Sequence, residues 1–363
     1  MRPSCRNRKN RLKSNKGVGA LQLDTKLLKP TFPNLKFCAE LLKSGEIVGV
    51  PTETVYGLAA NAFDDGAVLK IFKAKGRPHD NPIICHVNGL EMFKSLTCER
   101  SQVLFNLIDR FWPGPLTVVV EASVANLSRF VLAGLSTVGV RFSSSKVLNE
   151  LIGLCGFPLA APSANLSKKP SSTNATHVVA DFNGKIPAIL EGGQCEIGVE
   201  STVVKVERNR CVVLRPGFIT VNMLKSVVKN VELSAGVVQE LQQDDVVESP
   251  GLKHRHYSPK AEVVVVRSEL SDFVSYVSSK LNEKVWCVVA DEEADRFGNF
   301  VLTYGKNLAE QAKNLFFVLR RVDDLKIDKV FFRCSAEHES ELGLAIYNRL
   351  IRAANFNIIN FES

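Results

Sequence analysis

The sequence predicts an α/β protein built from two domains. Helical and strand patterns alternate through most of the 363-residue chain, which is typical of mixed helix and sheet. A short turn at 207–210 joins two strand patterns and predicts antiparallel pairing in the first part of the chain. Beyond about residue 260, single strands alternate with helices, as in a small parallel sheet with helices on its faces. The length and the hydrophobic content of 45% suit two ordinary globular cores.

In the first part of the chain, short apolar runs bounded by turn residues predict strands, and apolar residues at three- and four-residue spacing predict helices. The strand patterns lie at 46–50, 82–87, 116–121, 137–142, 157–161, 188–190, 201–206 and 211–215. The helical patterns lie at 67–73, 103–111, 147–154 and 224–231. Pro113 and Pro115 stop the second of these helices, and Gly156 ends the third.

The pattern breaks between 232 and 260, where Ser-Pro pairs and a glycine interrupt it, and we expect an interdomain linker there. Strand patterns then follow at 261–266, 285–290 and 329–332, separated by helical patterns at 270–281, 308–325 and 344–354. We therefore divide the chain into a basic tail at 1–20, a first domain at 21–231, the linker at 232–260 and a second domain at 261–363.

Positive charge is concentrated at the start of the chain. Residues 1–16 hold seven basic side chains and no acid, so they carry seven of the eight net positive charges. Such a tail can contact RNA weakly through unspecific charge attraction, although its composition is also that of a solvated extension. It lacks the apolar core of a secretory signal and is too poor in apolar residues for an amphipathic presequence. We expect a cytoplasmic protein, and the tail leaves a nuclear or mitochondrial fraction open.

The cysteines and the apolar runs limit the class of protein. None of the nine cysteines has Cys-x-x-Cys spacing or stands near a histidine at the spacing of zinc ligands. We therefore expect reduced thiols that fill cores and no metal site built from side chains. No apolar run approaches the roughly 18 residues that span a bilayer, so we expect no membrane insertion.

The most informative polar segment runs from 73 to 82 and holds Lys73, Lys75 and Arg77 at alternate positions. Pro78 pushes Arg77 towards extended geometry, and in an extended segment the three cations would share a face. Three cations held together need an anion between them, and both residue types suit phosphate. Because the chain has no Gly-x-x-x-x-Gly-Lys-Ser/Thr loop, side chains and turns would hold a nucleotide. Lys73 continues the preceding helical pattern and is the cation that we expect to be peripheral.

Polar side chains near the ends of three predicted strands are candidates for ligand contacts. Arg141 stands on an otherwise apolar strand and needs an anionic partner, either a ligand or a protein carboxylate. Ser163 and Asn165 follow small residues that would let a ligand approach the backbone, although a serine or Asx turn explains them equally well. His86 ends an apolar strand, and we expect it to have a role beyond packing. The sequence offers no Ser-His-Asp set.

Seven short segments, in order, resemble motifs of the threonylcarbamoyl-AMP synthase family in its two-domain form. They lie at 51–58 (Pro-Thr-Glu-Thr-Val-Tyr-Gly-Leu), 73–82, 112–117 (Trp-Pro-Gly-Pro-Leu-Thr), 138–141, 161–165 (Ala-Pro-Ser-Ala-Asn), 200–203 and 214–217. The segment at 249–259 resembles the family's interdomain signature, and 345–350 resembles the last helix of its second domain. Each motif alone is weak, whereas the ordered set is specific and extends from about Leu21 to the end.

The resemblance implies a fold and a reaction. The first domain would have a YrdC-like mixed twisted sheet with helices, and the second, Sua-type domain a smaller Rossmann-like parallel sheet. L-threonine, bicarbonate and ATP would give threonylcarbamoyl-AMP and pyrophosphate by nucleotidyl transfer, with Mg²⁺ on the phosphates. Downstream tRNA threonylcarbamoyl-transferase machinery would then modify an adenosine beside the anticodon. The linker would act as a lid that keeps water from the mixed anhydride.

The resemblance also implies the site residues. Those matching the threonine site are Thr54, His86, Arg141, Ala161 and Ser201, among which Arg141 would clamp the carboxylate. Those matching the ATP site are Arg77, Asn81, Thr137, Ser163, Asn165, Ser171, Arg215 and His254. Lys75 and Arg77 would carry catalysis by neutralising charge. His254 stands where relatives more often have tyrosine.

Two other functions remain consistent with the residues. A non-enzymatic RNA-binding module is one, but the nearly neutral body of the chain argues against it. A carbamoyl-adenylate enzyme with another acceptor is the second, because Arg141 and the small residues around Ala161 favour an amino acid without excluding a close analogue of threonine.

Overall fold

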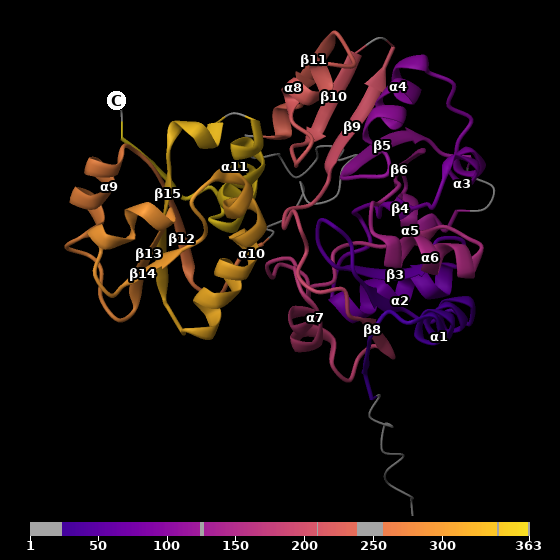
Figure 1. The fold of residues 1–363 in the computed structure, drawn as a ribbon, viewed down its shortest axis with the longest axis horizontal. Helices are drawn as coiled ribbons and strands as arrows, with labels where there is room; N and C mark the ends of the chain where they lie inside the picture. Colours follow the sequence, from indigo (N-terminus) through magenta and orange to yellow (C-terminus); the bar gives the residue numbers. More distant parts are fainter. Residues whose placement is uncertain (1–23, 124–126, 209, 238–256, 340, 362–363) are drawn as a thin grey trace, which may run out of the picture.

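A computed structural model describes residues 24–123, 127–208, 210–237, 257–339 and 341–361. Two sheets, each with its own helices, form two lobes that lie side by side (Figure 1). The first is a mixed sheet of eleven strands, and the second is a parallel sheet of five. This confirms the predicted α/β class, the mixed sheet of the first part and the parallel sheet of the second.

The first sheet has the strand order β1-β8-β2-β3-β7-β4-β6-β5-β9-β10-β11. Its strands are β1 (Lys26–Leu28), β2 (Val48–Val50), β3 (Gly57–Asn61), β4 (Cys85–His86), β5 (Leu116–Glu121), β6 (Thr137–Arg141), β7 (Leu159–Ala160), β8 (Ala188–Leu190), β9 (Thr202–Glu207), β10 (Arg210–Arg215) and β11 (Asn230–Leu233). The pairing of β9 with β10 is antiparallel, as the short turn between them predicts. The parallel pairing of β4 with β6 places His86 beside Arg141.

Eight helices accompany this sheet in the described residues. They are α1 (Phe32–Lys43), α2 (Asp65–Lys75), α3 (Leu90–Leu96), α4 (Gln102–Phe111), α5 (Arg129–Leu132), α6 (Lys146–Cys155), α7 (Ala175–Phe182) and α8 (Val221–Lys225). Side chains cap several of them; Asp64, for example, accepts hydrogen bonds from the backbone of Gly66 and Ala67 at the start of α2. Gly76 ends α2 in the left-handed region at φ 61°, where glycine carries little steric cost.

The second domain follows the predicted alternation. Its elements are β12 (Glu262–Arg267), α9 (Leu270–Val277), β13 (Val285–Val289), β14 (Val301–Thr303), α10 (Leu308–Asp324), β15 (Lys329–Cys334), α11 (Glu341–Ala353) and β16 (Ile358–Asn360). The strand order is β14-β13-β15-β12-β16, and every neighbouring pair is parallel. The apolar run from Val263 to Val266 is buried on both faces, as expected for a parallel strand covered by helices.

Two local predictions are wrong. The helix expected at 224–231 ends at Lys225, and the chain returns as β11, which pairs in parallel with β10. Its apolar residues therefore pack against a sheet edge instead of continuing a helical face. The strand expected at 82–87 is reduced to β4, because the preceding residues form an irregular segment beside the cavity described below.

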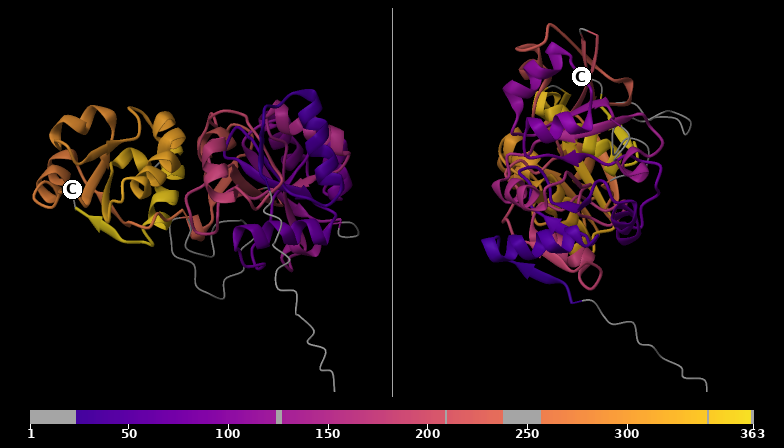
Figure 2. Two further views of the ribbon diagram at one scale, coloured as in Figure 1. Left: turned by 90° about the horizontal axis from the view of Figure 1, so that it is seen from below. Right: turned by 90° about the vertical axis from the view of Figure 1, so that its right-hand side faces the viewer.

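Helices α10 and α11 face the first domain, as two orthogonal views show (Figures 1 and 2). The contact extends into the cores, because Val55 and Val199 of the first domain pack within the hydrophobic cluster of the second. Gly198, at φ +81°, approaches α10 so closely that an added Cβ would lie 2.3 Å from the Cα of Lys313. This closeness requires glycine, and it brings loops of the first domain against the second.

The described cysteines are unpaired, and all except Cys98 are buried, which agrees with the expected role as core residues. No helix in the described part of the chain is both long and apolar enough to traverse a bilayer. The basic tail, together with 238–256 of the linker, lies outside the described residues.

Candidate functional site

A cleft with about 610 Å³ of empty space, including its mouth, opens where β4 and β6 end. The loops after β2 and β7 and the segments flanking β9 and β10 complete its walls. Eight of the predicted site residues line it: Thr54, Arg77, His86, Arg141, Ala161, Ser163, Ser201 and Arg215. The tertiary structure therefore joins residues that are up to 161 positions apart in the chain.

Arg141 ends β6 and is 4% exposed. Its Nη1 donates to Thr54 Oγ1 at 2.8 Å, and its Nε donates to the carbonyl oxygen of Gly114 at 3.3 Å. Its Nη2 lies 2.7 Å from Glu53 Oε1, forming an ion pair. The predicted need for an anionic partner is thus met by a protein carboxylate, while the terminal nitrogens keep further N–H groups for a second acceptor.

Glu53 is the residue that fixes this arginine. Burial would raise its pKa, but the charge of Arg141 and a hydrogen bond from Ser143 lower the pKa to about 2. The backbone N–H of Ser144 also donates to Glu53 at 3.2 Å. The carboxylate is therefore ionised at neutral pH and holds the guanidinium in a fixed orientation at the cavity wall.

His86 lies beside Arg141 and is 4% exposed. Burial and the neighbouring charge of Arg141 lower its pKa to about 3. Its Nδ1 has no hydrogen-bond partner among the described residues. A neutral imidazole with an unused nitrogen at the wall of a cavity is suited to hydrogen-bond a ligand.

We expect replacement of His86 by glutamine to flatten the loss of stability on acidification. The unfolded chain binds a proton at His86 near pH 6.5, whereas the folded protein does so only near pH 3. The free energy of unfolding therefore falls as the pH drops through this window, by up to about 1.4 kcal/mol per pH unit for one proton. Urea unfolding between about pH 7 and 5 would measure how steeply the stability of the wild type and of the variant changes with pH. The stability of each protein is expressed relative to its own value at neutral pH. An unchanged slope would mean that folded His86 takes up its proton normally.

Arg77 and Asn81 form a second polar group, on the segment after α2. Arg77 Nη2 donates to the carbonyl oxygens of Asn81 and Pro82 at 3.0 and 3.2 Å. Its buried Nε has no hydrogen-bond partner among the described residues, and neither amide atom of Asn81, which is 2% exposed, has one. Buried polar groups are normally paired. Arg77 lines the cavity and has this N–H group to offer a ligand, whereas Asn81 does not line the cavity. Burial lowers the pKa of Arg77 to about 10, which leaves it charged at neutral pH.

The three cations at 73–77 do not share an extended face, so that expectation is wrong. Helix α2 continues to Lys75 and only then ends at Gly76. Lys73 is exposed, as expected for a peripheral residue, whereas Lys75 is 4% exposed and points inward. Helical geometry turns successive side chains by about 100°, which separates Lys73 from Lys75.

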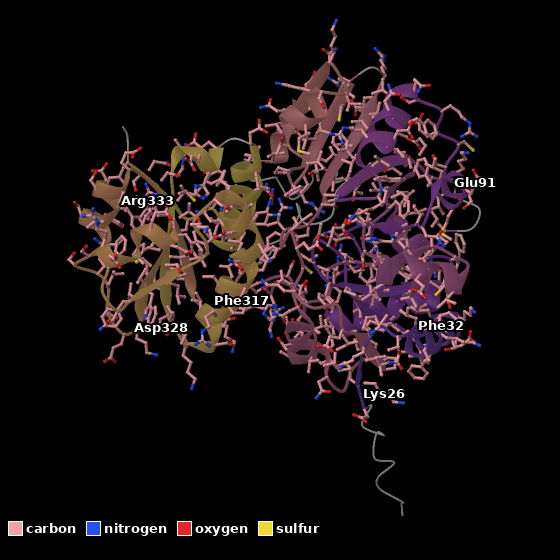
Figure 3. The ribbon with its side chains drawn as sticks, viewed as in Figure 1. Lys26, Phe32, Glu91, Phe317, Asp328 and Arg333 are labelled. Atoms are coloured by element: carbon pink, nitrogen blue, oxygen red, sulfur yellow. The ribbon has the colours of Figure 1, made fainter. Side chains whose placement is uncertain are left out.

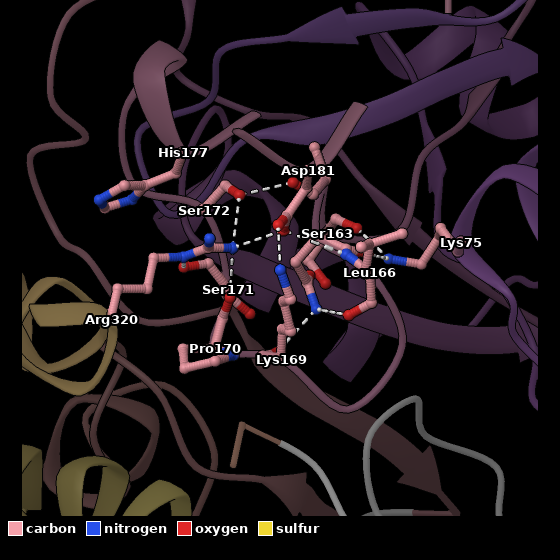
Figure 4. A network of polar contacts seen from close by, with 12 residues as sticks. Lys75, Ser163, Leu166, Lys169, Pro170, Ser171, Ser172, His177, Asp181 and Arg320 are labelled. Carbon is pink, nitrogen blue, oxygen red and sulfur yellow. Dashed lines mark hydrogen bonds and ion pairs between the residues drawn. The ribbon is translucent and has the colours of Figure 1, made fainter. Parts of the chain in front are cut away.

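Lys75 binds the loop that follows β7 and does not line the cavity (Figure 4). Its Nζ donates to the carbonyl oxygens of Ser163 and, at 2.7 Å, Asn165. Burial, followed by the charge of Arg77, lowers its pKa well below the usual value. The geometry makes Lys75 a support for this loop. Ser163 itself reaches the cavity. The Asn165 amide instead donates to the carbonyl oxygens of Leu166 and Lys169, which agrees with the turn that the sequence analysis gave as one of two explanations.

Ser201 and Arg215 also line the cavity and contact each other. Arg215 Nη2 donates to the carbonyl oxygen and the hydroxyl of Ser201 at 3.0 and 3.2 Å. The Ser201 hydroxyl also lies 2.8 Å from that of Thr117. Burial lowers the pKa of Arg215 to about 10. Ser171 does not line the cavity; its hydroxyl donates to Glu200 Oε1 at 2.6 Å.

Other residues depart from the predicted set. Thr137 begins β6 at the end opposite Arg141 and does not line the cavity. His254 lies outside the described residues. Glu200 and Tyr257 line the cavity, although sequence reasoning did not place them among the site residues. Glu200 precedes Ser201 in the motif at 200–203, and Tyr257 lies in the segment at 249–259. Their position within these motifs is the sequence feature that could have identified them as site residues.

The family model described as "Telomere recombination" matches residues 40–217, and the model described as "Threonylcarbamoyl-AMP synthase, C-terminal domain" matches residues 219–355. The chain belongs to the threonylcarbamoyl-AMP synthase family. This confirms the resemblance inferred from the motifs.

Similar proteins span nearly the whole chain. A threonylcarbamoyl-AMP synthase of Pyrococcus abyssi is 39% identical, with 90% of this chain and 95% of that protein covered. The one of Bacillus subtilis is 37% identical, with 90% and 94% covered. The crystal structure of P. abyssi Sua5 complexed with L-threonine is 38% identical and has a TM-score of 0.85, covering 94% of this chain and 99% of that one. Both domains of the family are therefore present.

Proposed function

We propose that this chain is an L-threonylcarbamoyladenylate synthase, which converts L-threonine, bicarbonate and ATP into threonylcarbamoyl-AMP and pyrophosphate. The observation that carries the proposal is that three arginines from three segments of the chain line one cavity. Arg141, oriented by Glu53, ends β6, Arg77 follows α2, and Arg215 ends β10. An amino acid carboxylate and a polyphosphate each need a cationic partner. The relative from P. abyssi binds L-threonine, which supports assigning Arg141 to the carboxylate.

The threonine set lies around Arg141. Thr54, held by the guanidinium, and Ser201 offer hydroxyls, and neutral His86 offers its unused nitrogen. Ala161 keeps the wall small, so that the substrate can approach the backbone. The ATP set comprises Arg77, Asn81, Ser163 and Arg215, with Asn165, Ser171, Lys75 and Thr137 as outer members. His254 completes the set proposed from the family.

The chemistry requires alignment and charge neutralisation without a protein nucleophile. The threonine amine and bicarbonate form a carbamate and release water. A carbamate oxygen then bonds to the α-phosphorus of ATP, and the bond from that phosphorus to pyrophosphate breaks, its electron pair leaving with pyrophosphate. Negative charge develops on the phosphates, where Arg77 and Arg215 would stabilise it.

Mg²⁺ enters as part of the substrate MgATP. The described residues contain no cluster of three or more His, Cys, Asp or Glu side chains that could hold a metal. Glu200, the acidic residue that lines the cavity, already contacts Ser171 and an arginine of the second domain. Mg²⁺ held largely by phosphate oxygens and water is typical of nucleotide sites.

We further propose that the linker covers the site. Tyr257 is 4% exposed and lines the cavity next to Glu200 and Arg215, which supports a lid that excludes water from the mixed anhydride. The product would pass to tRNA threonylcarbamoyl-transferase machinery for modification beside the anticodon. The proposed location is cytoplasmic.

Pyrophosphate release tests the reaction directly. We expect release from MgATP only when both L-threonine and bicarbonate are present, because the attacking oxygen belongs to their carbamate. Omission of either one, with carbon dioxide removed from the buffer, is the control. Release with ATP alone would indicate a hydrolase, and equal release with serine would point to another acceptor.

A further inference from the structure

Two arginines of the second domain contact the loops that frame the cavity of the first. Arg320 lies on α10 and Arg349 on α11, the helices that face the first domain (Figure 1). The Arg349 side chain is fully buried, and that of Arg320 is 12% exposed. Neither residue lines the cavity. Buried arginines at a domain boundary need defined acceptors, and both find them in the first domain.

Arg349 joins two segments of the cavity wall. Its Nε donates to Glu200 Oε2 at 3.1 Å, and its Nη2 donates to the Glu200 carbonyl oxygen at 3.2 Å. Its Nη1 donates to the carbonyl oxygen of Pro216. Glu200 precedes Ser201, and Pro216 follows Arg215. One guanidinium therefore fixes the backbone next to Ser201 and next to Arg215, which are both proposed ligand-binding residues.

Glu200, held by Arg349, in turn contacts the loop that carries Ser171. Its second carboxylate oxygen accepts the Ser171 hydroxyl at 2.6 Å. Arg320 also contacts this loop, donating to the Pro170 carbonyl oxygen at 2.7 Å and the Ser172 hydroxyl at 3.1 Å (Figure 4). It also pairs with buried Asp181 at 2.8 Å.

The charge of Arg349 also acts on the cavity. Glu200 lines the cavity, where a carboxylate would repel ATP phosphates. Burial would raise its pKa, but Arg349 and then Arg215 lower it, so Glu200 is ionised at neutral pH. Without Arg349, Arg215 would become the main cation acting on Glu200. The carboxylate would then compete with phosphate for Arg215.

We propose that Arg349 is a positioning residue for the adenylation reaction: through its contacts with Glu200 and Pro216 it sets the geometry of Ser171 and Arg215, and it neutralises the carboxylate at the ATP-facing wall. The inference rests on the proposed function and gives the second domain a part in it. The site of the first domain is complete only when α11 supplies this cation.

The test compares Arg349→Met, Glu200→Gln and the double variant in the full-length protein. We expect Arg349→Met to raise KM for ATP by about tenfold or more, with a change in KM for threonine below about threefold. Glu200→Gln in the same chain should recover most of this loss, because it removes the uncompensated charge. The matched control is Arg333→Met. Arg333 pairs with Glu293 at 2.7 Å, with side chains that are 11% and 12% exposed, inside the second domain and away from the boundary (Figure 3).

A purely structural role would give a different result. Arg349→Met and Arg333→Met would then lose activity in proportion to their melting temperatures, both KM values would shift together, and Glu200→Gln would not rescue. Any of these outcomes would overturn the proposal. If Arg349→Met does not fold, Arg349→Lys, which keeps the charge but loses the fork, should show a smaller selective loss. Titration calorimetry with ATP repeats the comparison without turnover, so an inactive wild-type protein would count against the proposed function alone.

Discussion

The double substitution Arg141→Met with Glu53→Gln is expected to give a folded protein that no longer binds threonine. Arg141 is the cation next to the proposed carboxylate position, and its three contacts hold it in place. Loss of a buried, hydrogen-bonded charge partner costs roughly 2–5 kcal/mol, or about 30- to 5000-fold in affinity. Arg141→Met alone would also leave Glu53 as an unpaired buried carboxylate and endanger folding. Neutralising Glu53 in the same chain separates binding from stability.

Threonine binding can be followed by the shift in melting temperature that the amino acid causes and by KM for threonine in pyrophosphate release. KM for ATP should change much less. Arg129→Met is the matched control, because Arg129 pairs with Asp65 at 3.1 Å on the surface, its side chain 79% exposed. A double variant that keeps threonine affinity within about twofold of the wild type would place the carboxylate elsewhere.

Replacement of Arg77 by methionine is expected to lower kcat/KM for ATP by about 10²- to 10³-fold, the range for loss of one oxyanion-stabilising donor. Arg77 lines the cavity, and its Nε is buried without a hydrogen-bond partner among the described residues. Its Nη2 contacts two backbone carbonyl oxygens, so the side chain is already oriented. Arg77→Lys keeps a charge without the planar fork, so its kcat/KM for ATP should lie between those of the wild type and the methionine variant.

Lys73→Met provides the control for Arg77, because Lys73 belongs to the same run of cations but is exposed on α2. It should keep the kinetic constants of the wild type. The measurement is pyrophosphate release over a range of ATP concentrations at saturating threonine and bicarbonate. Equal losses in the Lys73 and Arg77 variants would indicate a diffuse electrostatic effect, and an unaffected Arg77 variant would remove this residue from the site.

The order of the motifs in the sequence predicts that most of the cavity residues belong to one site. It does not predict which of them contact one another. Arg141 was expected to need an anion, and Glu53, which supplies it, was visible in the motif at 51–58. No local pattern links the two, because 88 residues separate them. Parallel pairing of β4 with β6 brings His86 beside Arg141, and the loop after β2 then delivers Glu53.

Lys75 shows how the local interpretation failed. Alternate spacing suggested one extended face for three cations, whereas α2 extends through Lys75 until Gly76 adopts φ 61°. The side chain consequently points at backbone carbonyl oxygens 88 and 90 positions away. Helix ends depend on capping and packing, so periodicity alone does not fix them to the residue.

The sequence by itself determined the α/β class, the two-sheet organisation, the family and the types of side chain that the chemistry requires, because periodicity and ordered motifs are local properties of the chain. Only the tertiary structure decided which cations reach the cavity and that the second domain takes part in the site. The contact of Arg349 with Glu200 spans 149 positions. It exists because α11 packs against the first domain, and such packing depends on the shape and burial of two whole surfaces.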